Sequence, residues 1–159
     1  MVKVFVISVG SPKMKGLAVA IADYEARIAR YFKFEALEVR QQRIPPAADE
    51  KAIADVECQA LLGKVPSGMQ TVALDQRGVS WSSKELAEHL NQLALHGRPG
   101  VAFLVGGPLG LNDDFRNSVN KVLSLSSLTL PHELARLVLV EQIYRAGTIL
   151  RGEPYHKSG

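Results

Sequence analysis

The stretch FLVGGPLGL, residues 103–111, gives the strongest indication of the fold in this sequence. Apolar residues lead directly into two glycines, a proline and a third glycine. This G-G-x-x-G spacing differs from the G-x-G-x-x-G loop of dinucleotide-binding folds and from phosphate loops that end in G-K-[ST]. Because glycine lets a ligand approach the main chain closely, the stretch predicts a buried strand followed by an unusually bare turn.

Strand and helix patterns alternate on both sides of this stretch. Such alternation predicts an α/β layered domain with a mainly parallel sheet. Ligands of these sheets bind beyond the carboxyl ends of the strands, which places the glycine turn at the expected site, together with the loops after Asp75 and Leu125. The predicted strands are 3–9, 34–39, 70–75, 100–105 and 121–126, the predicted helices are 14–32, 48–64, 81–96, 112–119 and 131–150, and an irregular tail follows from 152.

Composition indicates an ordinary globular chain. Of the 159 residues, 47% are hydrophobic and 22% are charged, and no apolar run reaches the ~18 residues that a membrane span needs. The alternating N-terminal segment predicts a core strand and not a signal peptide. Cys58 is the single cysteine, so no internal disulfide can form, and a cytoplasmic location with a buried, inert thiol is expected.

Basic residues gather in two segments of a chain whose net charge is +3. Two interpretations stay open at this point: ordinary solvated surfaces, or the footprint of an RNA. The first group is Arg27, Arg30, Lys33, Arg40 and Arg43, and the second is Arg136, Arg145, Arg151, His156 and Lys157.

The segment LSLSSLTLP, residues 123–131, is apolar with small hydroxyl side chains and no charge. It can be a plain buried strand, just as the glycine turn can be a tight connection without a ligand. Placed beside that turn, however, it can form a narrow cleft of main-chain groups and leucines. Such a cleft suits an uncharged heterocycle and its sugar, held by backbone hydrogen bonds between apolar walls.

Several motifs together carry a specific resemblance that covers the whole chain. LVGGPLGL, LSLSSLTLPHELARLVLVEQIYRA and the terminal PYHK closely resemble the SPOUT methyltransferases of the large-subunit rRNA methyltransferase H type. The resemblance implies a single SPOUT domain over residues 1–159, with a trefoil knot in its C-terminal third. It also implies S-adenosylmethionine as the cofactor and a homodimer whose interface completes the active site.

The resemblance also assigns residues to the cofactor. Leu74 is expected on the adenine side, and main-chain groups of the segment 125–130 are expected to wrap the cofactor. The glycine turn contributes Gly106 and Gly107. The residues expected from the segment are Leu125, Ser126, Ser127, Leu128, Thr129 and Leu130.

Catalytic candidates lie in the last helix and the tail. Tyr155 and His156 are expected to close over cofactor and substrate, with His156 suited to proton transfer. Arg145 is a candidate electrostatic stabiliser, although an ion pair with Glu141 one turn earlier is an equally simple role. Lys157 stands where the family often has an arginine, which weakens the assignment of the tail. No residues have the spacing of a metal site.

The implied substrate is N3 of a pseudouridine in helix 69 of 23S rRNA, methylated on the ribosome or its large subunit. Neither a membrane nor DNA is expected as a partner. Two alternatives remain: a SPOUT methyltransferase that acts on another RNA such as tRNA, and a non-catalytic α/β module that binds a nucleotide at the glycine turn.

Overall fold

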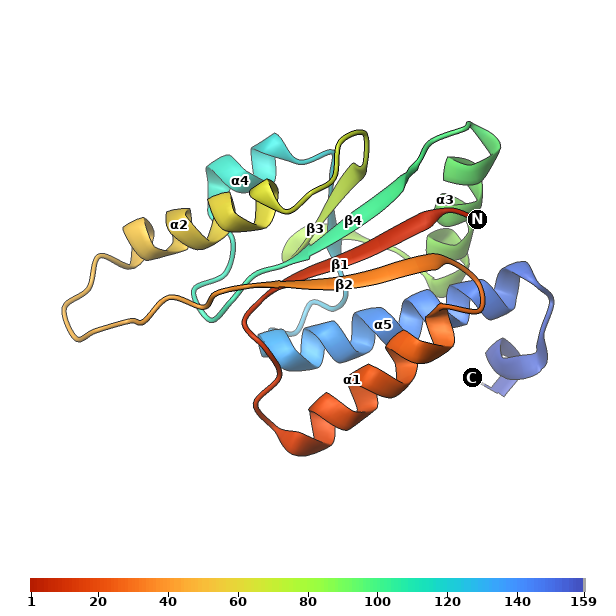
Figure 1. The fold of residues 1–159 in the computed structure, drawn as a ribbon, viewed down its shortest axis with the longest axis horizontal. Helices are drawn as coiled ribbons and strands as arrows, with labels where there is room; N and C mark the ends of the chain where they lie inside the picture. Colours follow the sequence, from red (N-terminus) through yellow and green to blue (C-terminus); the bar gives the residue numbers. More distant parts are fainter. Residues whose placement is uncertain (159) are drawn as a thin grey trace.

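The computed structural model describes residues 1–158, without the side chains of His156 and Ser158. Five parallel strands form one sheet in the order β2-β1-β4-β3-β5, as Figure 1 shows. The α/β class and the parallel sheet are therefore confirmed. The elements are β1 (Lys3–Val9), α1 (Lys15–Ile28), β2 (Lys33–Val39), α2 (Glu50–Gly63), β3 (Gln70–Ser80), α3 (Ser83–Leu95), β4 (Gly100–Val105), α4 (Asp113–Ser118), β5 (Lys121–Ser124), α5 (His132–Leu150) and the 3-10 helix η1 (Pro154–Ser158).

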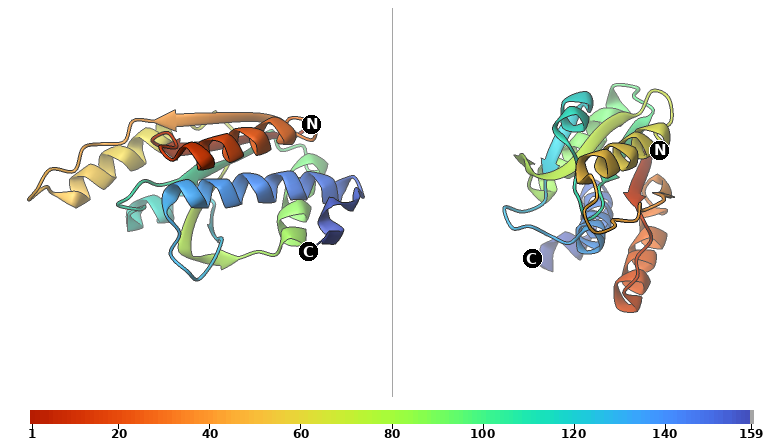
Figure 2. Two further views of the ribbon diagram at one scale, coloured as in Figure 1. Left: turned by 90° about the horizontal axis from the view of Figure 1, so that it is seen from below. Right: turned by 90° about the vertical axis from the view of Figure 1, so that its left-hand side faces the viewer.

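Helices cover both surfaces of the sheet, so the molecule has three layers (Figure 2). Along β4, Val101, Phe103 and Val105 face a core that includes α3 and α5. Ala102 and Leu104 point the other way, toward α2 and α4. Because β4 is buried on both sides, it reads as one continuous apolar run and not as an alternating strand.

Helix α5 packs between α1 and α3 on its side of the sheet. Gly147 allows this close approach, because a Cβ atom there would lie 2.4 Å from Cγ of Tyr31. Tyr31 itself lies beyond the end of α1, although its helical spacing had placed it within the predicted helix 14–32. The chain leaves the helix at Ile28 and turns directly into β2.

Strand β3 differs most from the sequence prediction. A strand 70–75 followed by a loop was predicted, whereas β3 continues to Ser80. The pairing with β5 is interrupted between Leu74 and Val79, so the register shifts and the intervening residues bulge. Bulges often re-aim side chains beside functional sites, and this one carries Asp75, Gln76 and Arg77 to the edge of a cavity.

Helix starts agree well with the sequence signals. Ser82 caps α3 in a reciprocal capping box with Glu85, and Asn112 accepts a bond from the amide of Phe115 at the start of α4. Pro131 is the N-cap of α5 and not part of its first turn, and β5 ends at Ser124, two residues earlier than predicted. The predicted irregular tail is in fact ordered through η1.

Two smaller predictions can be compared directly with the structure. Cys58 is 1% exposed, and burial raises the pKa of its thiol, as expected for an inert core cysteine. Within residues 1–158, none of the helices is long and apolar enough to cross a bilayer.

The contact between Gly147 and Tyr31 gives a test of this packing. We expect Gly147→Ala to lower the free energy of unfolding by about 1–3 kcal/mol, because the new methyl group must displace the Tyr31 ring. Urea denaturation measures the change. Gly16→Ala in α1 is the matched control, because a Cβ atom at Gly16 would meet nothing within 4 Å. An equal loss in both variants would contradict this account of the helix packing.

Candidate functional site

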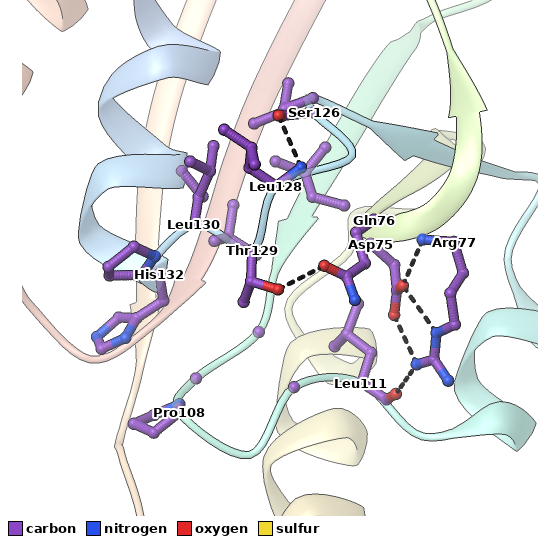
Figure 3. Close-up of a pocket in the computed structure, with 18 residues that line it drawn as sticks. Asp75, Gln76, Arg77, Pro108, Leu111, Ser126, Leu128, Thr129, Leu130 and His132 are labelled. Atoms are coloured by element: carbon purple, nitrogen blue, oxygen red, sulfur yellow. Dashed lines mark hydrogen bonds and ion pairs between the residues drawn. The ribbon is translucent and has the colours of Figure 1, made fainter.

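A cavity of about 680 Å³ lies beyond the carboxyl ends of β4 and β5, beside the bulge of β3 (Figure 3). This is the position that parallel α/β sheets use for ligands, and the volume is within the usual range for small-molecule sites. The structure brings most of the residues predicted for the cofactor to this one place. Those that line the cavity are Leu74, Gly106, Gly107, Leu125, Ser126, Leu128, Thr129 and Leu130, whereas Ser127 is exposed and is not part of the lining.

The glycine turn is bare because its surroundings leave no room for side chains. A Cβ atom on Gly107 would lie 2.9 Å from Cγ1 of Val9, and one on Gly106 would lie 3.0 Å from Cδ2 of Leu111. Gly110 has a φ of +71° and donates its amide to the carbonyl of Gly107. The turn therefore presents main chain to the cavity in a conformation that glycine adopts without strain.

The opposite wall is the segment 125–130, which forms no regular strand or helix. Its shape is fixed by hydroxyl groups: Ser124 Oγ donates to the Ser126 carbonyl, and Ser126 Oγ accepts from the amide of Leu128. Thr129 Oγ1 donates to Oε1 of Gln76 at 2.7 Å and so joins this wall to the bulge of β3. The Leu128 side chain remains 72% exposed, which is unusual for leucine and offers an apolar surface to a ligand.

Asp75 ties the bulge to the chain that follows the glycine turn. Its carboxylate accepts from Nε and Nη2 of Arg77 and pairs with Nη1 of Arg116 at 3.3 Å. Both arginines also reach the carbonyl of Leu111, at 3.4 and 3.5 Å. Since the Leu111 side chain packs against Gly106, this charge cluster determines where the glycine turn lies.

Sequence reasoning missed this cluster and also the contribution of His132 to the lining. The aspartate that closes an apolar run was visible as a signal, since strands of this fold often end in functional carboxylates. Its partners were not visible. Arg116 lies on a different element, and nothing in the sequence shows that β3 bulges to bring Asp75 and Arg116 together.

The predicted catalytic residues lie at the other end of α5. Arg145 pairs with Glu141 at 2.8 Å, and its guanidinium lies 5.0 Å from the centre of the Tyr155 ring. Tyr155 donates its hydroxyl to Glu141 at 3.0 Å and packs edge-on against Tyr144. The simple ion pair that the sequence offered for Arg145 is therefore present, and it includes Tyr155. The backbone of His156 belongs to η1, but its side chain lies outside the described part of the chain.

Arg145 and Tyr155 both have shifted pKa values. The hydrogen bond with Glu141 raises the pKa of Arg145, so its positive charge persists at every physiological pH. Burial, followed by the bonds to Tyr24 and Glu141, raises the pKa of Tyr155 well above its usual value. Tyr155 is therefore a neutral hydroxyl that donates hydrogen bonds and does not serve as a base.

The cavity and the tail do not meet within one chain. His132 stands at the cavity and Arg145 near the tail, and a helix rises 1.5 Å per residue, so about 20 Å separates the two positions. The structure thus brings the predicted cofactor residues together and the predicted catalytic residues together, but it holds the two groups apart. Among the side chains that the structure describes, which exclude that of His156, no cluster could hold a metal ion.

Comparison with known proteins agrees with this architecture. A family model described as "Predicted SPOUT methyltransferase" matches residues 2–156. Proteins named "Ribosomal RNA large subunit methyltransferase H" from Streptococcus thermophilus and Clostridium novyi are each 43% identical to the chain. Alignments with them cover 98% and 96% of this chain and 99% and 98% of the relatives.

Solved structures show the same fold at low sequence identity. The crystal structure of a probable methyltransferase from Bordetella pertussis superposes with a TM-score of 0.56 at 18% identity, over 91% of this chain and 96% of that one.

The role of Asp75 can be tested without any ligand. We expect Asp75→Asn to lower the free energy of unfolding by about 1–3 kcal/mol, because Arg116, whose side chain is 16% exposed, loses a charged partner. Amide hydrogen exchange in the segment 106–111 should become faster. The control is Asp114→Asn, which changes an exposed carboxylate on α4. Unchanged exchange in 106–111 would show that the cluster does not hold the glycine turn.

Proposed function

The chain belongs to the SPOUT methyltransferase family, and from this premise we propose that it methylates large-subunit ribosomal RNA with S-adenosylmethionine as the methyl donor. The observation that carries the proposal is the cavity between the bare glycine turn and the segment 125–130. When bound, S-adenosylmethionine supplies a methyl carbon on a sulfonium centre, which an electron-rich atom attacks in line.

The residues of the cavity suit this cofactor in shape and in chemistry. Leu74, Leu125 and Leu128 supply apolar lining, which suits a planar heterocycle. Main-chain groups of Gly106 and of the segment 125–130 supply hydrogen-bonding atoms at close range. A side chain on Gly106 or Gly107 would collide with Leu111 or Val9, so glycine is needed for the turn to pack in this position beside the cavity.

The names of the relatives support a proposal for the substrate class. The relatives from Streptococcus thermophilus and Clostridium novyi carry the name of a large-subunit rRNA methyltransferase. We propose the same class of substrate here, and more specifically N3 of a pseudouridine in helix 69 of 23S rRNA. Because the chain has no added RNA-binding module among the matched residues 2–156, recognition of shape on an assembled ribosomal surface fits the proposal.

A homodimer is part of this proposal, because one chain holds its catalytic candidates about 20 Å from its cavity. Half-buried residues recur along one stripe of α5 at Leu134, Leu137, Val138, Glu141 and Arg145. Such a stripe packs incompletely within a single chain and suits a second copy related by a two-fold axis. In that dimer, Arg145, Tyr155 and His156 of one chain would stand at the cavity of the other.

The catalytic roles follow from the charges of these groups. N3 of the base must lose a proton, so negative charge develops on the base carbonyls. The persistent cation of Arg145 and the neutral hydroxyl of Tyr155 are suited to stabilise that charge. Neither is suited to take up the proton, and we propose His156 or water as the acceptor. A knotted path of the C-terminal third stays a prediction of the family resemblance.

The cofactor proposal predicts direct binding to the isolated protein. Calorimetry should detect S-adenosylmethionine and its demethylated product. Gly107→Ala should weaken this affinity about tenfold, because its methyl group must move Val9 or push the turn into the cavity. Gly63→Ala is the control, since a Cβ atom at Gly63 would meet nothing within 4 Å. A well-folded dimer that binds neither compound would refute the proposal.

The substrate proposal predicts that labelled methyl groups enter 23S rRNA. Purified protein is incubated with labelled S-adenosylmethionine and with ribosomes, isolated subunits or tRNA, and mass spectrometry then locates the methylated nucleotide. Label in tRNA alone would favour a different RNA target. Absence of label from every RNA, despite cofactor binding, would favour a non-catalytic nucleotide-binding module.

The tail proposal predicts that methyl transfer needs residues after Glu153. A chain that ends at Glu153 should keep its circular dichroism spectrum but lose methyl transfer. Tyr155→Phe should lower kcat about 100-fold, with a smaller change in KM, because it removes one donor to the developing charge. Full turnover in the shortened chain would contradict the roles given to Tyr155 and His156.

A further inference from the structure

A second cavity, of about 370 Å³, lies where the C-terminal halves of α1 and α5 run side by side. Its lining residues are Asp23, Ala26, Arg27, Arg30 and Tyr144. None of them lines the cofactor cavity, and no comparison assigns them a role.

Aromatic rings make the floor of this cavity rigid. Tyr144 stands at the centre of a tyrosine cluster, and its ring centre lies 5.9 Å from that of Tyr24, 5.8 Å from that of Tyr31 and 4.7 Å from that of Tyr155. The contact with Tyr31 is edge-on and depends on Gly147, as shown above. Tyr144 therefore separates the second cavity from the candidate catalytic residue Tyr155 by the width of one ring.

Arginine side chains lie over these rings. The Arg27 guanidinium stands 5.7 Å from the ring centres of both Tyr24 and Tyr144. Arg151 lies 4.7 Å over the Tyr31 ring and donates to the carbonyl of Arg30. Stacking on aromatic surfaces holds guanidinium groups in position. Their side chains therefore lose less conformational entropy when an anion binds.

The charge at the cavity favours an anion. Asp23 pairs with Arg27 at 2.9 Å, but both side chains are about half exposed, so this pair is weak. Among the ion pairs of residues 1–158, none involves Arg30. One guanidinium is therefore unmatched by a carboxylate, and a second is shared with a single exposed aspartate.

We propose that this cavity binds a backbone phosphate of the substrate RNA, close to the nucleotide that receives the methyl group. The inference rests on the proposed function and adds a recognition site to it. Arg27 and Arg30 supply planar donors that match a phosphate. Tyr144 is only 9% exposed, so it supports Arg27 from below and does not itself offer a face to a base. The cavity lies close to Tyr155, because Tyr144 lines the cavity and packs against the Tyr155 ring at 4.7 Å.

Asp23 makes the proposal testable in two directions. Its carboxylate competes with a phosphate for Arg27 and repels the phosphate directly. Arg30→Gln should therefore weaken RNA binding, whereas Asp23→Asn should strengthen it. A surface that merely needs these residues for folding would not give opposite signs.

The experiment measures binding of the full chain to purified large ribosomal subunits at several salt concentrations. Arg30→Gln should weaken binding about tenfold at low salt, as expected for loss of a charge-assisted hydrogen bond. It should also make the slope of log K against log salt shallower by about 0.7–0.9, the value for one phosphate contact. Arg98→Gln is the matched control, because Arg98 is an exposed arginine outside both cavities. Affinity for S-adenosylmethionine should stay the same in all three variants.

An unchanged salt slope in Arg30→Gln would overturn the inference. So would a change in dimer dissociation with an unchanged slope, measured by analytical ultracentrifugation, because the cavity would then belong to the interface between two copies. If the wild-type chain does not bind large subunits, the inference falls as well. A different result would contradict the proposed function: subunits that bind to the wild-type chain but take up no labelled methyl group.

Discussion

The charge cluster around Asp75 is the constraint on which the candidate site depends. It joins the bulge of β3, the chain after the glycine turn and the short helix α4 through two arginines, Arg77 and Arg116. Both arginines pair with the carboxylates of Asp75 and Asp113 and reach the carbonyl of Leu111. Without it, the parallel strands would still form, since their core is apolar and independent of this cluster. The cavity would be less well defined, because the three glycines of the turn contribute no side chains that could hold its shape.

Helix α5 gives the molecule its second organising feature, since it carries a different part of the site at each end. Its first turn contributes His132 and Ala135 to the cofactor cavity, and its last turns hold the Arg145–Glu141–Tyr155 contacts. A continuous helix fixes the separation between His132 and Arg145, which both lie on it. The half-buried stripe along the same helix offers a consistent solution, in which two copies each complete the site of the other.

Aromatic and cationic side chains connect the contacts around Tyr155 with the second cavity. The tyrosine cluster keeps Tyr155 neutral by burial and at the same time supports Arg27 and Arg151 above its rings. The structure divides the basic residues, which the sequence showed only as two groups, into buried and exposed ones. Arg136 is 5% exposed and paired with Glu25 and Glu38, so it serves the interior, whereas Arg27 and Arg30 line an open cavity.

The sequence by itself determined the alternation of strands and helices, the buried central strand before Gly106 and the cap at Ser82, because periodicity and capping are local properties of the chain. It also placed the glycine turn at one edge with the loops after Asp75 and Leu125, since parallel strands end at one edge, whereas Leu74 and the segment 125–130 were assigned by the family resemblance. Only the tertiary structure decided that β3 bulges at Asp75, that Arg116 meets it, and that Gly147 admits Tyr31. These features depend on contacts between residues far apart in the sequence, and no local pattern records such contacts.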